Sequence, residues 1–250
     1  MPAPVRNIFW LLSVVFLLTS CSRNYRPVAV QTKDYRVNRA PGATDPLSLL
    51  LKPYADSVHR SMDAVLGMAT VPLERKKPES TLGNWMADVL GSTAAEKYDT
   101  VVDAAFLNYG SIRLPALPAG EITLGKIYEL CPFDNTMVLM RLTGSQLKTF
   151  VDIQAAAGGW PCSGVNYQIR DNRVRDLRVG GKPVSDTIIY SVATLDYVAN
   201  GGDQCGLLRP LPRKDRGLLF RDALVARLAE LHRQGRKLES KLENRVTYAQ

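Results

Sequence analysis

Apolar and polar positions follow two different periods along this chain, which predicts both helices and strands. Ser80 or Thr81 would cap the second of four predicted helices, and a break at Thr143-Gly144 would precede the third. The apolar residues with helical spacing are Val58, Met62, Val65 and Leu66; Leu82, Trp85, Met86, Val89 and Leu90; Leu147, Phe150 and Val151; and Phe220, Leu224, Leu228 and Leu231.

Short runs that are apolar throughout, or apolar at every second position, predict strands between these helices. They cover residues 101–107, 136–142, 165–170, 174–179 and 188–193. Asp171-Asn172 separates the third run from the fourth and is typical of a tight hairpin turn. Because helices and strands alternate, we expect an α/β or α+β fold, with a mixed sheet and flanking helices.

The first 21 residues have the pattern of a targeting signal. Arg6 precedes an apolar stretch at 8–18, which is too short to span a bilayer comfortably. The stretch ends in Leu18-Thr19-Ser20-Cys21, which resembles the bacterial lipobox, in which the cysteine is lipidated. An ordinary secretory signal with a coincidental cysteine is the alternative.

This pattern predicts three parts of the chain. Residues 1–21 would be a lipoprotein signal peptide, residues 22–46 a polar tether with one strand near 27–30, and residues 47–250 the compact domain. Acyl chains on Cys21 would anchor the protein in the cell envelope, on a bacterial membrane and facing the periplasm or the exterior.

Composition and charge are those of a globular protein with a basic surface. Apolar residues make up 46% of the chain and charged residues 22%, and the net charge is +8. Lysine and arginine outnumber acidic residues at 209–245. This stretch is either a solvated helical face or a patch facing phosphate or membrane. No recognised nucleic-acid-binding module accompanies it, so we expect no nucleic-acid partner.

The number and spacing of the cysteines and histidines limit the metal and disulfide chemistry that this chain can support. Cys131, Cys162 and Cys205 follow the predicted signal; one disulfide can form among them, but their spacing is not that of a zinc site, and we expect them to be buried. His59 and His232 are isolated in predicted helices. A two-metal phosphoesterase needs several histidine and carboxylate ligands, and the usual hydrolase and P-loop motifs are missing from the sequence.

Five segments, in order, resemble the C-terminal domain of the 5'-nucleotidases, and together they extend over about residues 50–248. The segments are Ser80-Thr81-Leu82-Gly83-Asn84 with Met86-Ala87-Asp88; Asp103-Ala104-Ala105 with Asn108-Tyr109-Gly110-Ser111-Ile112-Arg113; Gly120-Glu121-Ile122-Thr123 with Cys131-Pro132-Phe133-Asp134-Asn135 and Leu142-Thr143-Gly144; Val192-Ala193-Thr194 with Tyr197-Val198-Ala199-Asn200-Gly201-Gly202-Asp203; and Leu242-Glu243-Asn244-Arg245-Val246.

The resemblance implies a nucleoside site. In that family a separate N-terminal metallophosphatase domain hydrolyses the phosphate ester, while the C-terminal domain stacks the base between two aromatic rings. By position, the rings would be Phe133 and Tyr197, and Asp203 would bind the ribose hydroxyls. The other implied substrate contacts are Asn108 and Arg113 to base, ribose or phosphate, Gly110 for close approach, and Lys76 for phosphate.

Several positions depart from the family pattern, which would alter the specificity of the pocket. Tyr109 and Ser111 stand where the family has glycine or another small residue, and Gln204 and Cys205 replace a glycine and an aromatic residue. Lys76 replaces an arginine and would lose its bidentate geometry.

Three hypotheses remain open at this level. The first is a nucleoside- or nucleotide-binding subunit in extracytoplasmic nucleotide catabolism, with the metallophosphatase, and its divalent metals, on a separate chain and no cofactor in this one. The second is a nucleoside-binding envelope lipoprotein with no enzymatic role. The third is a stand-alone hydrolase that uses an unrecognised site. Nucleotides, nucleotide sugars and cyclic nucleotides are all candidate ligands.

Overall fold

The computed structural model describes residues 32–35 and 46–249. The predicted signal peptide, Cys21 and the predicted strand near 27–30 lie outside the described residues. From Leu47 onward the chain forms one compact unit, and the fold below is that of this unit. In the part of the chain that the structure describes, no helix has both the length and the apolarity needed to cross a membrane.

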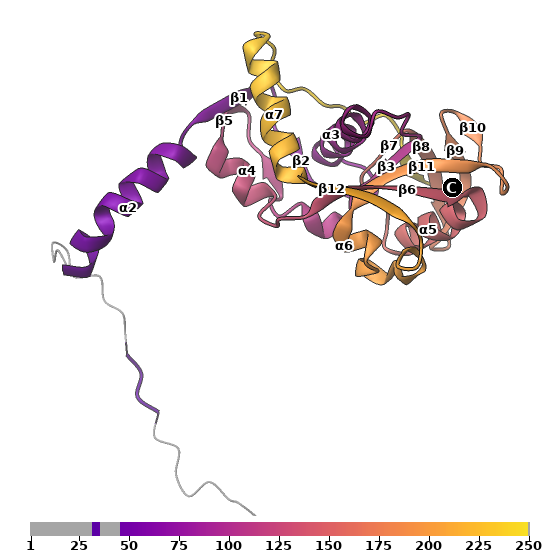
Figure 1. Ribbon diagram of the computed structural model, residues 1–250, viewed down its shortest axis with the longest axis horizontal. Coiled ribbons are helices and arrows are strands. Elements are labelled where there is room, and N and C mark those ends of the chain that lie inside the picture. The colour runs from indigo at the N-terminus through magenta and orange to yellow at the C-terminus, as the bar shows by residue number, and fades with distance from the viewer. Residues whose placement is uncertain (1–31, 36–45, 250) are drawn as a thin grey trace, which may run out of the picture. The chain divides into compact units, whose positions relative to one another are not determined.

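The centre of the fold is a five-stranded mixed sheet (Figure 1). Strand β11 lies between β6 and β3, antiparallel to the first and parallel to the second. In sheet order the strands are β12 (Arg213–Leu219), β6 (Thr136–Thr143), β11 (Ile189–Leu195), β3 (Ala104–Phe106) and β7 (Cys162–Ser163). The expected fold class, a mixed sheet with flanking helices, is confirmed.

A second, four-stranded sheet contains the predicted hairpin. Its order is β10 (Lys182–Pro183), β9 (Arg173–Val179), β8 (Val165–Arg170) and β13 (Val246–Tyr248). Asp171 and Asn172 at the turn have φ of 52° and 58°, as a two-residue type I′ turn requires. Two short antiparallel pairs complete the strands, β1 (Val65–Ala69) with β5 (Gly120–Thr123) and β2 (Leu73–Glu74) with β4 (Ala116–Leu117).

Helices cover both faces of the central sheet, and two hydrophobic clusters fill the space between (Figure 1). Helices α3 (Thr81–Tyr98), α4 (Leu124–Leu130) and α7 (Phe220–Arg233) pack in one cluster, and α5 (Gly144–Ala156) in the other. Along β6 the side chains alternate between them: Met137 and Leu139 enter the first, and Val138 and Met140 the second. The apolar run at 136–142 is therefore a strand buried on both faces.

Local sequence signals account for where two of these helices begin. The Ser80 hydroxyl caps α3 by accepting a hydrogen bond from Gly83 N at 3.1 Å, as predicted. Thr143 and Gln146 form a reciprocal capping box at the start of α5. The remaining helical segments are α2 (Pro46–Met62), α6 (Asp196–Ala199) and the 3-10 turns at Tyr109–Ser111, Gly202–Gln204 and Gly206–Leu208.

The prediction that Val65 and Leu66 continue the first helix was wrong. Helix α2 ends at Met62, and Val65 begins strand β1, which pairs with β5. Leu124 N donates to Ala64 O at 2.9 Å, so the backbone at this point bonds to a distant segment rather than to the preceding turn. Tertiary pairing overrides the local apolar spacing here.

Candidate functional site

Three chain segments meet at one edge of the central sheet. Because β3 and β11 are parallel, they end at the same edge, where the antiparallel β6 begins (Figure 1). Asn108 follows β3, Tyr197 follows β11 in α6, and Phe133 precedes β6. The carboxyl ends of parallel strands are a common place for ligand sites in α/β proteins.

Asp203 links two of the predicted residues at this edge. Its Oδ2 accepts a hydrogen bond from Asn108 Nδ2 at 2.8 Å, and its Oδ1 accepts one from the Tyr197 hydroxyl at 3.3 Å. Asn108 is buried, and its own Oδ1 accepts from the Ser111 hydroxyl. We call Asn108, Tyr197 and Asp203 the Asp203 cluster.

The Gly201-Gly202-Asp203 turn is shaped to fit beneath the Tyr197 ring. Gly201 has φ of 92° and Asp203 has φ of 48°, both in the left-handed region. A Cβ at Gly202 would lie 2.4 Å from the Tyr197 ring, far inside contact distance, so any other residue there would have to displace the ring. The turn therefore determines both where Tyr197 lies and where the Asp203 carboxylate points.

Phe133 brings a second aromatic ring to the same edge. Phe133 and Tyr197 are each 45% exposed, which leaves much of both rings open to solvent. The Arg113 guanidinium lies 5.6 Å from the centre of the Phe133 ring, within cation–π range. Asp196 Oδ1 accepts from Thr136 N at 3.1 Å, which ties the start of α6 to the start of β6 and so connects the two segments that carry the rings.

Lys76, the predicted phosphate residue, makes its ion pair with Glu74 and is largely exposed. Arg75 and Lys77, on either side of Lys76, instead lie near the loop that follows Asn108. The Arg75 guanidinium lies 4.8 Å, and the Lys77 ammonium 4.7 Å, from the centre of the Tyr109 ring. Sequence reasoning missed both cations, although the run Arg75-Lys76-Lys77 was the signal that could have pointed to them.

Gly110 is exposed, and a Cβ built on it would have only Asn108 Nδ2 nearby, at 3.6 Å. The protein's own packing therefore does not require glycine at this position. Its predicted part in close ligand approach stays a prediction.

The three cysteines are buried free thiols, which confirms the expectation of burial. Burial raises the pKa of Cys131 to about 11 and the pKa of Cys162 and Cys205 to about 12, because the thiolate would lose its hydration. Cys205 lies beside the cluster, with its Sγ 3.6 Å from Asp203 O. Protonated, buried thiols are poor nucleophiles and poor metal ligands.

Within the described ranges, no group of three or more His, Cys, Asp or Glu side chains is placed to hold a metal ion. His59 and His232 are both exposed, in α2 and α7. A two-metal hydrolytic centre needs clustered ligands of these kinds, so the described residues do not fit one.

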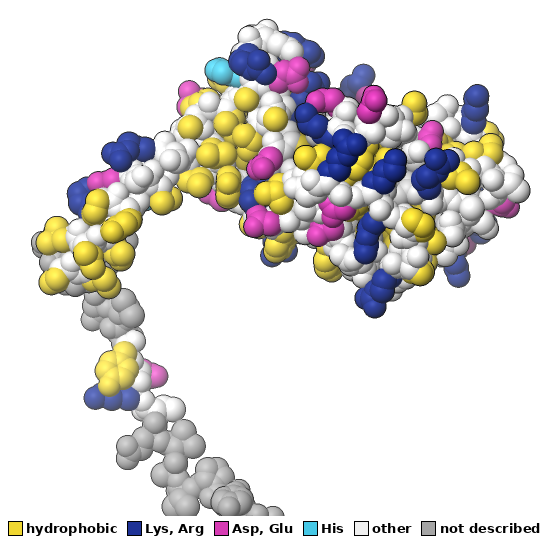
Figure 2. Space-filling view, viewed as in Figure 1, with side chains coloured by type: hydrophobic (Ala, Val, Ile, Leu, Met, Phe, Trp, Pro, Cys, Tyr) yellow, Lys and Arg dark blue, Asp and Glu magenta, His cyan; other side chains and the backbone are white. Residues whose placement is uncertain are grey.

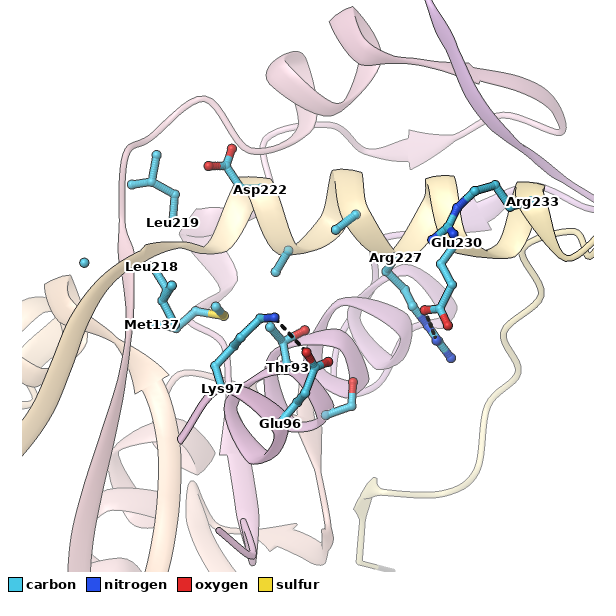
Figure 3. Close-up of a pocket in the computed structure, with 14 residues that line it drawn as sticks. Thr93, Glu96, Lys97, Met137, Leu218, Leu219, Asp222, Arg227, Glu230 and Arg233 are labelled. Carbon is cyan, nitrogen blue, oxygen red and sulfur yellow. Dashed lines mark hydrogen bonds and ion pairs between the residues drawn. The ribbon is translucent and has the colours of Figure 1, made fainter. Parts of the chain in front are cut away.

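A cavity of about 630 Å³ lies between α3 and α7, apart from the Asp203 cluster (Figure 3). Four of its charged side chains form ion pairs, Lys97 with Glu96 and Arg227 with Glu230, each at 2.7 Å. It contains none of the predicted site residues. The exposed ion pairs indicate a solvated groove between two helices.

Comparison with known proteins relates this chain to one protein family. The family model described as "5'-nucleotidase, C-terminal domain" matches residues 61–209, more than half of the chain. All three segments of the sheet edge, and the whole Asp203 cluster, lie inside this range.

Individual relatives agree with the family model. Protein UshA of Escherichia coli is 28% identical over 161 residues, which cover 62% of this chain and 28% of that protein. The trifunctional nucleotide phosphoesterase protein YfkN of Bacillus subtilis is 30% identical over 185 residues, which cover 67% of this chain and 12% of that protein.

Among solved structures, the 5'-nucleotidase precursor of Thermus thermophilus matches with a TM-score of 0.71 and 29% identity. The match covers 81% of this chain and 42% of that one. The chain thus spans less than a third of the two curated relatives and under half of the solved structure.

Proposed function

This chain belongs to the 5'-nucleotidase C-terminal domain family, and we propose that it binds the nucleoside part of a nucleotide at the Asp203 cluster. The observation that carries the proposal is the Asp203 carboxylate, which is bonded to Asn108 and Tyr197 at the sheet edge where Phe133 also lies. A nucleoside offers a flat base and a pair of vicinal hydroxyls, and this edge offers a partner for each.

The base would stack on the Phe133 and Tyr197 rings. Both rings are partly exposed, so they can contact a ligand without a rearrangement of the core. Stacking of a base on an aromatic side chain contributes about 1–3 kcal/mol. This contact depends little on which base is bound, because every base has a π-face.

The ribose would bind to Asp203. A carboxylate has about four acceptor positions, and Asn108 and Tyr197 use two of them, so Asp203 can still accept from the ribose hydroxyls. Arg113, beside Phe133, and the pair Arg75 and Lys77, beside Tyr109, supply positive charge for a phosphate. Lys76 also stays a candidate for this role, and Gly110 leaves open space next to Asn108.

Hydrolysis would take place on a second polypeptide. The described residues hold no cluster of metal ligands, and the chain spans only part of its longer relatives. We infer a division of labour in which this chain holds the substrate, while a metallophosphatase chain supplies the metals and cleaves the ester. An anchor at Cys21 would place the assembly on the envelope, in a pathway that degrades extracytoplasmic nucleotides.

Helix α2 supports this inference by offering a surface for the second chain. It buries none of its residues, and Leu50, Leu51, Tyr54 and Val58 are each more than half exposed. Apolar side chains gather along α2 in Figure 2. The helix lies mainly before the family match at 61–209, so it stands largely outside the part of the chain that the family model describes. We propose that the metallophosphatase chain covers this apolar face.

Calorimetric titration of the purified chain with adenosine, AMP and a panel of other nucleosides tests the binding site. We expect saturable binding by the native chain and a loss of affinity of at least about 10-fold in Phe133→Ala and in Tyr197→Ala, because each removes one stacking face. Tyr54→Ala is the matched control, since Tyr54 is exposed on α2 and outside the site. No binding by the native chain, or equal losses in all three variants, would contradict the proposal.

A further inference from the structure

The loop that carries Phe133 has little regular structure of its own. Residues 131–135 connect α4 to β6, and Pro132, Phe133 and Asp134 are exposed. An exposed loop fixes an aromatic ring poorly unless its backbone is held from elsewhere. Arg113 contacts the Phe133 ring, and the contacts that hold the loop's backbone come from the first turn of α7, far along the sequence.

Arg221 bonds to the backbone along this loop. Its Nη1 is within hydrogen-bond distance of three successive carbonyl oxygens, Cys131 O at 3.3 Å, Pro132 O at 3.1 Å and Phe133 O at 3.4 Å. Its Nη2 donates to the Asp134 carboxylate. The neighbouring Phe220 N donates to Asn135 O at 3.0 Å, so every residue from 131 to 135 is bonded to the start of α7.

The Arg221 guanidinium is itself held in place. Its carbon lies 4.2 Å from the centre of the Tyr128 ring, and the residue is only 6% exposed. A planar guanidinium can stack on a ring and donate in several directions at once, whereas a lysine ammonium is a compact point charge. Because the residue is so buried, its contacts are with the loop and with Tyr128 rather than with solvent.

We propose that Arg221 is a positioning residue for nucleoside binding, which holds the Phe133 ring where a base can stack on it. The inference rests on the proposed nucleoside site and adds a residue that acts through Phe133. Arg221 reaches the ligand only through the 131–135 backbone, so its whole effect on affinity should pass through the ring.

The first measurement is the adenosine affinity of Arg221→Lys by calorimetry, with thermal unfolding to show that the variant is folded. We expect the dissociation constant to rise by about 10-fold or more, within the range for neighbouring groups that act together. Arg227→Lys is the matched control, because Arg227 lies on the same helix but pairs with Glu230 on an exposed face. Its affinity should match that of the native chain.

A double-variant cycle separates positioning from a general structural effect. In the Phe133→Ala background, Arg221→Lys should raise the dissociation constant by less than about 2-fold, because the ring it positions is already gone. Should Arg221→Lys fail to fold, Asp134→Asn serves instead. It removes the negative charge of one exposed partner of Arg221 and should weaken binding about 2- to 3-fold in the native background only.

The possible results separate the role of Arg221 from the proposed nucleoside site itself. Equal losses in the native and Phe133→Ala backgrounds, with binding by the native chain intact, would overturn the role of Arg221 alone. Unchanged affinity in folded Arg221→Lys would do the same. A native chain that binds no nucleoside would overturn the proposed function, and this inference with it.

Discussion

The positions of the Tyr197 ring and the Asp203 carboxylate depend on Gly202, because this residue has no side chain. The Tyr197 ring occupies the space that a Cβ at Gly202 would fill, and the next residue, Asp203, accepts a hydrogen bond from the Tyr197 hydroxyl. The ring and the carboxylate are therefore placed by the same tight turn. A change there should move both groups together, without disturbing the buried core.

Gly202→Ala should weaken nucleoside binding by about 10-fold or more, because the added methyl group displaces the Tyr197 ring. Gly206→Ala is the matched control, since a Cβ at Gly206 meets no atom within 4 Å. Both variants are compared with the native chain by calorimetric titration. Equal affinity in all three would show that Tyr197 does not contact the ligand.

At the residue scale, the sequence motifs located side chains that the structure brings together, but not those whose contacts depend on the tertiary fold. Phe133, Asn108 and Asp203 stand in motifs that the family resemblance could locate. Arg221 lies in a helix whose sequence pattern predicts only an apolar face, and its contacts with the 131–135 loop depend on the packing of α7 beside that loop. The orientations of Arg75 and Lys77 toward Tyr109 likewise depend on the fold.

At the scale of elements, the sequence predicts best where burial has a simple period. Strands β6, β8, β9 and β11 and helices α3, α5 and α7 all overlap runs that periodicity identifies. Strand β12 does not, because it is a largely exposed edge strand with lysine and arginine at several positions. Charged residues on an edge strand discourage pairing with another chain, and they also remove the alternation that would reveal the strand.

Helix α2 exposes an apolar face that we expect a partner chain to cover. Leu50→Gln/Tyr54→Gln should abolish capture of a metallophosphatase from envelope extracts of the source organism, while nucleoside affinity stays within about 2-fold of native, because the exposed face lies outside the site. The control, Arg60→Gln, changes a polar residue of the same helix. The captured chains are identified by mass spectrometry.

Two results would contradict the proposal that a metallophosphatase chain binds to α2. One is undiminished capture by the double variant. The other is the absence of any metallophosphatase among the chains that the native protein captures, which would favour a nucleoside-binding lipoprotein with no enzymatic role.

At the scale of the whole molecule, the expected organisation joins an envelope anchor to a substrate-binding domain. The anchor rests on the sequence from Arg6 to Cys21, which lies outside the described residues. The domain rests on the family match and on the two-cluster core around the mixed sheet. These two parts have independent evidence, so they are tested separately.

Cys21→Ser should move the protein out of the membrane fraction of the cells that produce it, because the acylated cysteine would be lost. Fractionation followed by intact-mass measurement checks both the location and the acyl groups. Conversion of a different cysteine, in Cys131→Ser, should leave the location unchanged. Equal partition of the native chain and Cys21→Ser would contradict lipid anchoring at this residue.

We expect this chain to hold a nucleotide without cleaving it. Equilibrium dialysis of the purified chain against AMP, with divalent metal present and free phosphate assayed in the same samples, tests both halves at once. AMP should be retained by the chain and recovered intact. Failure to retain AMP, or release of phosphate that a chelator suppresses, would contradict it.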